Sequence, residues 1–205
     1  MTDILPTTLP RPGGDIHYIV SGRNHAPALV LLPPQEAGLD SWDLQLVEFE
    51  RFFRVIRIDL RSSLQDPALD ALAVLDALHI ERAHWCGLSI GGITALQVAI
   101  VAPRRVLRLV LASTASSLPS SATDRESPVR EIAVRDADVL TQLGEVQAPT
   151  LVIAGAHDPS IPIERAEELA DGISGADLVV LDAGHLPNVE QAEDFTRTVV
   201  DFLRD

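Results

Sequence analysis

The fold is decided by eight residues near the middle of the chain, which read Trp85-Cys86-Gly87-Leu88-Ser89-Ile90-Gly91-Gly92. The short apolar run at 83–86 favours a β-strand, and a helix-forming run follows at 93–99. Between them stands G-x-S-x-G, which in a strand–turn–helix context is typical of a turn that exposes a nucleophilic serine. The glycines permit a strained turn in which strand and helix press together where a Cβ would clash. Ser89 is predicted to lie at a helix N-terminus, where backbone N–H groups favour developing negative charge.

An alternative interpretation of this stretch has no chemistry in it. A glycine-rich turn between strand and helix occurs in any doubly wound protein, and Ser89 could be a helix N-cap there. The pattern alone is expected by chance roughly 0.07 times in a chain of this length. Its context and the partners of Ser89 must therefore decide between the two interpretations.

The composition limits the class of protein. A length of 205 residues suits one domain, which we expect to span 1–205. The chain is 46% hydrophobic but only 4% aromatic, so its core must consist of Ala, Val, Leu and Ile. A net charge of −14 argues against nucleic acid and anionic membrane as partners. The sequence contains no lysine, which excludes a lysine Schiff base and a P-loop lysine.

The sequence suggests neither a metal nor a cofactor. The single cysteine, Cys86, has no second thiol for a disulfide or a shared metal, so we expect a small core residue. The segment 1–14 is rich in Pro, Thr and Gly without the apolar region of a signal peptide, and no apolar run approaches membrane length. These features predict a soluble, cytoplasmic protein.

Strands and helices alternate along the chain. Strands are predicted at 15–20, 28–32, 54–58, 83–86, 106–112, 150–154 and 178–181. Helices are predicted at 41–52, from Asp66 through Leu78, from 93 to near Pro103, and at 136–143, 164–171 and 189–203. Their expected core faces carry Trp42, Leu46 and Phe49, then Leu69, Leu72, Leu75 and Leu78, and last Phe195, Val199 and Phe202. Residues 113–130, rich in Ser, Thr and Pro, are expected to form a loop. The alternation predicts a mainly parallel sheet with helices on both sides.

A serine hydroxyl needs a general base to take its proton, and the base needs an acid to orient it. In a parallel sheet the carboxyl ends of the strands share one edge, so both partners should follow strands. Asp158 and His185 fit as acid and base, because each comes just after a predicted strand. The order Ser89, Asp158, His185 is that of α/β-hydrolases. Asp59 is an alternative acid and His157 an alternative base; Asp182 is less favoured, since it lies beside the last strand.

The sequence resembles the α/β-hydrolase fold family over nearly its whole length, and within it the 3-oxoadipate enol-lactonase-like branch. The resemblance is carried by residues 41–42, 54–59, 87–92, 105–111 and 148–155, by Asp158, and by Ala183-Gly184-His185. It implies an α/β fold with a mainly parallel central sheet flanked by helices. Relatives with this fold cleave many kinds of bond, and a serine at position 89 argues against those that attack with a carboxylate.

The chain departs from the family pattern at two places that bear on its site. Relatives commonly have His-Gly where this sequence has Pro33-Pro34, so the expected oxyanion-hole donors are the backbone N–H groups of Gln35 and Ile90. Residues 113–147 have room for only a shortened cap, which predicts an open, shallow site. A second copy of the chain is one candidate to cover that site.

These features lead to three hypotheses about function. The first is a serine hydrolase that cleaves a small carboxylic ester or lactone through Ser89, His185, Asp158 and an acyl-enzyme. The second is a cyclase or lyase on the same fold, in which His185 acts as the base and Ser89 only donates a hydrogen bond. The third is a non-catalytic binding protein, for which Ser89 and His185 should lie beyond hydrogen-bond reach with no pocket beside them.

Overall fold

The computed structural model describes residues 6–12, 14–34, 37–59, 66–115 and 141–205. In these residues eight strands form one sheet in the order β1-β2-β4-β3-β5-β6-β7-β8. The strands are β1 (Thr7–Leu9), β2 (Ile16–Gly22), β3 (Ala28–Leu32), β4 (Arg54–Asp59), β5 (Ala83–Leu88), β6 (Val106–Ala112), β7 (Thr150–Gly155) and β8 (Asp177–Leu181). β1 and β2 are antiparallel to their neighbours, and the pairs from β4 to β8 are parallel. The predicted mainly parallel sheet is confirmed.

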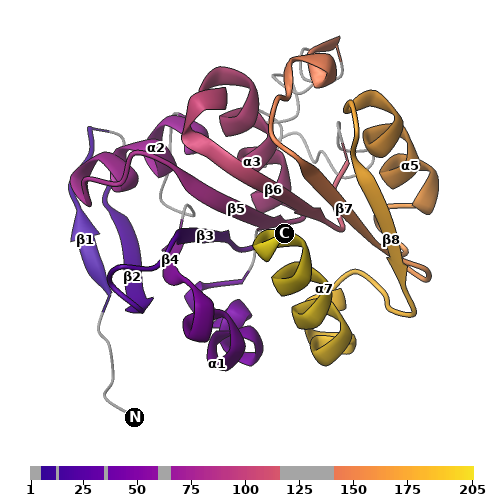
Figure 1. Cartoon of the computed structure of the whole chain (residues 1–205), viewed down its shortest axis with the longest axis horizontal. Helices are drawn as coiled ribbons and strands as arrows, with labels where there is room; N and C mark the ends of the chain where they lie inside the picture. The colour runs from indigo at the N-terminus through magenta and orange to yellow at the C-terminus, as the bar shows by residue number, and fades with distance from the viewer. Residues whose placement is uncertain (1–5, 13, 35–36, 60–65, 116–140) are drawn as a thin grey trace.

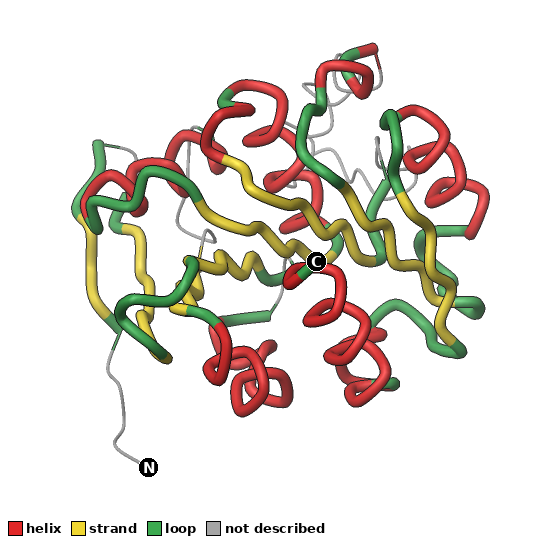
Figure 2. The backbone as a smooth tube through the Cα atoms, viewed as in Figure 1, coloured by secondary structure: helices red, strands yellow, loops and turns green. Residues whose placement is uncertain are grey.

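Helices cover both faces of the sheet, as Figures 1 and 2 show. One face packs against α2 (Pro67–Ala77), α3 (Ile90–Val101) and α5 (Ile163–Gly172), and the other against α1 (Asp43–Phe52) and α7 (Ala192–Arg204). Short 3-10 helices lie at Leu39–Trp42, Pro103–Arg105 and Leu143–Glu145. In β3, the side chains of Val30 and Leu32 lie in the core layer against α2, α3 and α5, whereas those of Leu29 and Leu31 lie in the core layer against α1 and α7. Successive side chains of a strand point to opposite faces of the sheet. A strand that is covered on both faces therefore needs a continuous run of apolar residues.

Helix α2 begins as the sequence predicts but buries a different face. Asp66 caps it by accepting the N–H groups of Ala68 and Leu69, and Pro67 occupies its first turn. Leu69, however, is 52% exposed, while Leu72 is buried. The expected leucine face is wrong at this position, since small alanines on α2 also form part of the buried surface.

The end of the chain differs from the single predicted helix over 189–203. A short helix α6 (Pro187–Glu190) is separated from α7 by Gln191, whose φ of −130° and ψ of 50° are not helical. Phe195 and Val199 are buried as expected, but Phe202 is only partly buried and Leu203 takes its place in the core. Strand β1 was not predicted, being a three-residue edge strand. Residues 116–140, with most of the predicted loop and the helix at 136–143, lie outside the described residues.

Candidate active site

Ser89 occupies a strained turn between β5 and α3. Its φ is 55° and its ψ is −119°, a backbone conformation that residues with a Cβ rarely adopt. The Ser89 N–H donates to the carbonyl of Ala112 at 2.9 Å, and its own carbonyl accepts the Thr114 hydroxyl at 2.8 Å. The end of the neighbouring strand β6 thus holds the backbone on both sides of the Ser89 side chain. The role of Thr114 was not predicted from the sequence, although its position two residues after the end of β6 could have indicated it.

The flanking glycines are required by close backbone approach. A Cβ on Gly87 would lie 2.2 Å from the carbonyl oxygen of Gly91, and a Cβ on Gly91 would lie 2.3 Å from the carbonyl oxygen of Leu32. Both distances are far below van der Waals contact, and the atoms met are backbone atoms. Strand β5, helix α3 and the end of β3 are therefore pressed together around Ser89, as the sequence predicts.

Three side chains that follow different strands form one chain of hydrogen bonds. His185 Nε2 lies 3.1 Å from Ser89 Oγ, and His185 Nδ1 lies 2.7 Å from Asp158 Oδ2. The other oxygen of Asp158 accepts the backbone N–H groups of Ser160 at 2.8 Å and Ile161 at 3.0 Å. Ser89 follows β5, Asp158 follows β7 and His185 follows β8, so the parallel sheet brings them to one edge.

The environment of Asp158 keeps its carboxylate ionised. Burial would raise the pKa of Asp158, whose side chain is only 1% exposed, but the hydrogen bonds from His185, Ile161 and Ser160 hold the pKa below its ordinary value. An ionised carboxylate favours the proton on His185 Nδ1. His185 Nε2, 3.1 Å from Ser89 Oγ, is then left without a proton and can accept a hydrogen bond from the Ser89 hydroxyl.

The alternative acid and base take other places. His157 Nε2 lies 2.8 Å from Asp182 Oδ1 in an exposed pair. Asp59 ends β4, and β3 separates that strand from β5. The hydrogen bonds of Ser89 and His185 thus join them to Asp158 rather than to these residues.

The two expected oxyanion donors differ in what the structure describes. Ile90 is the first residue of α3, so its N–H is among those that a helix leaves without an intrahelical acceptor. Gln35 lies outside the described residues. The segment before it leaves β3 beside Ser89, because a Cβ on Gly91 would also lie 2.6 Å from the Pro33 carbonyl oxygen.

Cys86 is a core residue, as expected. It is fully buried in β5, and burial raises the pKa of its thiol. Within the described ranges, no group of three His, Cys, Asp or Glu side chains is arranged to hold a metal ion. No helix in this part of the chain is both long and apolar enough to cross a membrane.

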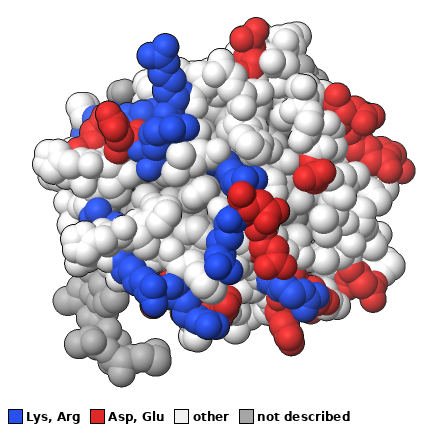
Figure 3. Space-filling model, viewed as in Figure 1, with Lys and Arg blue, Asp and Glu red and all other residues white. Residues whose placement is uncertain are grey.

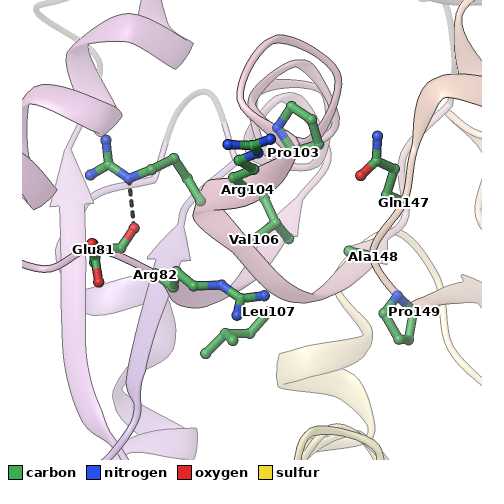
Figure 4. A pocket seen from close by; sticks show the side chains of 10 residues that line it. Glu81, Arg82, Pro103, Arg104, Val106, Leu107, Gln147, Ala148 and Pro149 are labelled. Carbon is green, nitrogen blue, oxygen red and sulfur yellow. Dashed lines mark hydrogen bonds between the residues drawn. The ribbon is translucent and has the colours of Figure 1, made fainter.

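A pocket of about 620 Å³, shown in Figure 4, lies at the amino ends of the parallel strands, whereas Ser89 follows the carboxyl end of β5. Its lining residues, 81–82, 103–107 and 147–149, come just before or at the start of β5, β6 and β7. The amino and carboxyl ends of strands of this length lie about 20 Å apart. Arg105 at its wall donates to the carbonyls of Ile80 and Glu81 and pairs with Asp76. The pocket is therefore separate from Ser89.

Charge is unevenly spread over the surface. On the face shown in Figure 3, acidic side chains lie along the right side and in a band at the lower centre, over α7, and arginines lie mainly over the left and centre.

A parallel sheet with helices on both faces, a serine in a strained strand–helix turn and a histidine–aspartate pair beyond it define an α/β-hydrolase-fold enzyme. The family model described as alpha/beta hydrolase fold matches residues 27–136, more than half of the chain, and a second model, described as TAP-like protein, matches 125–205. The chain belongs to the α/β-hydrolase fold family.

Individual relatives agree with this assignment over almost the whole chain. The sequence is 27% identical over 252 residues to 3-oxoadipate enol-lactonase 1 of Acinetobacter baylyi, covering 95% of each chain. It is 27% identical over 252 residues to carboxylesterase YbfK of Bacillus subtilis, covering 93% of this chain and 84% of the relative. The enol-lactonase comparison spans more positions than the 205 residues present here, so that relative carries segments this chain lacks.

Solved structures give the same result. The enol-lactonase from Burkholderia xenovorans LB400 superposes with a TM-score of 0.83 at 27% identity, covering 97% of this chain and 100% of the other. A hydrolase from Pseudomonas aeruginosa PA01 superposes with a TM-score of 0.82 at 31% identity, covering 97% and 98%. The chain is thus similar to the enol-lactonase branch, as the sequence resemblance implied.

Proposed function

We propose that this protein is a serine hydrolase that cleaves a small carboxylic ester or lactone through an acyl-enzyme. The observation that carries the proposal is the unbroken hydrogen-bond chain from Ser89 through His185 to Asp158, with distances of 3.1 Å and 2.7 Å. Relatives named as an enol-lactonase and a carboxylesterase support the two substrate classes.

In the first half of the reaction, Ser89 Oγ attacks the substrate carbonyl carbon while His185 Nε2 takes the hydroxyl proton. The carbonyl oxygen becomes an oxyanion, which accepts hydrogen bonds from the backbone N–H groups of Ile90 and Gln35. Collapse of this intermediate breaks the carbon–oxygen bond, and His185 returns the proton to the leaving alkoxide. In a lactone that alkoxide stays attached to the acyl group.

In the second half, water attacks the acyl-enzyme with His185 again as the base, and Ser89 recovers its proton when the acid leaves. Asp158 orients the imidazole and stabilises the imidazolium formed in both halves. Its two backbone hydrogen bonds keep the carboxylate in place while the charge on His185 changes. This arrangement needs neither a metal nor a cofactor.

The exposed surface around the base favours a small substrate with an apolar part. Leu186, next to His185, is 37% exposed and Val189 is 48% exposed. We propose that residues 1–205 form one α/β-hydrolase domain in which 113–147 are a shortened cap, so that these apolar side chains border an open site. A second copy of the chain is the partner we propose for covering it.

The decisive experiment replaces the nucleophile. Ser89→Ala should lower hydrolysis of an activated ester such as p-nitrophenyl acetate by at least about a thousandfold, with an unchanged circular dichroism spectrum. Ser174→Ala, which alters an exposed serine in the turn before β8, is the matched control and should retain full activity.

A fluorophosphonate probe separates hydrolysis from the cyclase or lyase alternative. The wild-type protein should form a covalent adduct at Ser89, located by peptide mass spectrometry, because an activated serine attacks phosphorus as it attacks a carbonyl. Full ester hydrolysis by Ser89→Ala, or a wild-type protein that never reacts with the probe, would overturn the proposed mechanism.

A further inference from the structure

A single carboxylate holds the backbone on both sides of His185. Glu190 Oε2 accepts the N–H of Gly184 at 2.7 Å, and Glu190 Oε1 accepts the N–H of Leu186 at 3.1 Å. Glu190 is the last residue of the short helix α6, five positions after His185. The two residues that flank His185 are thus both bound by one side chain.

The loop that carries His185, residues 182–186, is also held by the strand that leads to Asp158. A Cβ on Gly155 would lie 2.0 Å from the carbonyl oxygen of Gly184, so the two backbones are in direct contact. The His157 N–H donates to the carbonyl of Ala183 at 2.9 Å. These contacts fix the start of the loop against β7, and the bonds to Glu190 fix the loop from the side of α6.

We propose that Glu190 is a positioning residue, whose carboxylate bridges the N–H groups of Gly184 and Leu186 and so keeps the His185 imidazole in line between Ser89 and Asp158. This inference rests on the proposed serine-hydrolase function. Glu190 acts through the backbone alone, and no proton transfer is assigned to it.

The bridge uses both oxygens of the carboxylate. Each N–H group meets its own oxygen, Oε2 for Gly184 and Oε1 for Leu186, and an ionised carboxylate supplies both acceptors in one plane. A glutamine at the same place offers one acceptor, and its NH₂ group faces the second N–H. A Cβ at Gly184 would lie only 3.1 Å from both oxygens of Glu190, so the carboxylate lies close against this glycine.

The location of Glu190 separates positioning from folding. The residue is exposed and belongs to a four-residue helix rather than to either core layer. Loss of its carboxylate should therefore disturb the geometry at His185 more than the stability of the domain.

The test compares Glu190→Gln and Glu190→Ala with Glu193→Gln, a matched control on an exposed glutamate in the first turn of α7. We expect kcat for p-nitrophenyl acetate to fall roughly tenfold to a hundredfold in both Glu190 variants, with KM within about twofold. Fluorophosphonate labelling of Ser89 should slow by a similar factor, and the NMR resonance of the His185 Nδ1 proton should shift or broaden. The control should match the wild type in each measurement.

The outcomes distinguish this inference from the proposed function. If Ser89→Ala is inactive but both Glu190 variants keep wild-type kcat and labelling rate per folded molecule, the positioning role is wrong and the hydrolase proposal stands. If activity falls only in proportion to the folded fraction, measured by circular dichroism, Glu190 is structural. If Ser89→Ala keeps full activity, the proposed function fails whatever the Glu190 variants do.

Discussion

Asp158 contacts His185 through one oxygen while the protein backbone holds its other oxygen. Oδ2 lies 2.7 Å from His185 Nδ1, and Oδ1 accepts the N–H groups of Ser160 and Ile161. The carboxylate therefore cannot rotate without breaking two backbone hydrogen bonds. This asymmetry determines what a neutral amide would do at the same position.

Replacement of Asp158 by asparagine should invert the tautomer of His185. The amide oxygen is expected to stay with the two backbone N–H groups, which places its NH₂ group against His185 Nδ1. Nε2 would then carry the ring proton and could not accept one from Ser89. We predict that Asp158→Asn lowers kcat by about 10³–10⁴-fold with the fold retained, measured by steady-state ester hydrolysis and circular dichroism.

Asp182→Asn is the control for that variant, because Asp182 pairs with the exposed His157 in an adjoining loop. Its kcat should stay within about twofold of the wild-type value. An Asp158→Asn enzyme that kept more than a tenth of wild-type kcat would show that the orientation of His185 does not depend on this carboxylate.

Glycine at position 87 should be indispensable for stability. A Cβ there meets the carbonyl group of Gly91 and the nitrogen of Gly92, all backbone atoms at 2.2–2.6 Å. Relief requires β5 and α3 to move apart. We predict that Gly87→Ala lowers the free energy of unfolding by about 1–3 kcal/mol or more, measured by urea denaturation.

Gly144→Ala provides the comparison, since a Cβ at Gly144 meets nothing within 4 Å. This variant should be neutral or slightly stabilising, because alanine restricts the unfolded chain. Equal stability of the two variants would mean that the contact around Gly87 relaxes at no cost.

Much of the fold and the meeting place of the site residues could be predicted from the sequence because each rests on a local pattern. Unalternated apolar runs indicate buried parallel strands, and parallel strands bring their carboxyl ends to one edge. Placing Ser89, Asp158 and His185 just after strands was therefore enough to predict that they approach one another. The structure gives the distances, while the catalytic role of each residue stays a proposal.

Other features depend on contacts that no local pattern shows. Leu69 follows the leucine spacing yet faces solvent, because Ala68 and Ala71 share the buried face and alanine carries little signal of its own. The bridge from Glu190 requires that α6 stop at that residue and the chain turn at Gln191. Such a bridge follows from the tertiary path of the backbone rather than from spacing.

A buried glutamine on α1 should stabilise the connection to α6. Gln45 is fully buried, and its Nε2 donates to the carbonyl of Asn188 at 2.6 Å. Asn188 in turn donates from Nδ2 to the carbonyl of Ser41 at 2.8 Å. We predict that Gln45→Ala lowers the free energy of unfolding by about 2–4 kcal/mol, because it opens a cavity and leaves the Asn188 carbonyl without its donor.

The matched control is Gln142→Ala, an exposed glutamine before the 3-10 helix at Leu143–Glu145, which should change stability by less than about 0.5 kcal/mol. Urea denaturation monitored by tryptophan fluorescence is suitable, since Trp42 lies beside Ser41 and is buried. A stability loss as small as that of the control would contradict the role of Gln45.

His84 should make the protein less stable in mild acid. It is buried in β5, and its ring meets that of Phe53 at an interplanar angle of 70° with 5.7 Å between ring centroids. Burial, with a smaller contribution from the positive charge of Arg108, lowers the pKa of His84 to about 4. In the unfolded chain the imidazole titrates near about 6.5.

The sign of the effect follows from proton uptake. Between about pH 6.5 and pH 4 the unfolded chain binds a proton at His84 that the folded protein does not, so the folded state loses stability as the pH falls through this window. Above it both states are neutral and the contribution is constant. After allowance for solvent screening, we predict a loss on the order of 1–2 kcal/mol by pH 4.5.

His84→Phe isolates this contribution, because phenylalanine keeps an aromatic ring against Phe53 and does not titrate. Urea denaturation of both proteins at pH 7 and pH 4.5 gives a difference in which the other titrating groups cancel. The variant should lose less stability than the wild type over that interval, by the amount assigned to His84. Equal losses in the two proteins would show that His84 is protonated as readily in the folded state as in the unfolded chain.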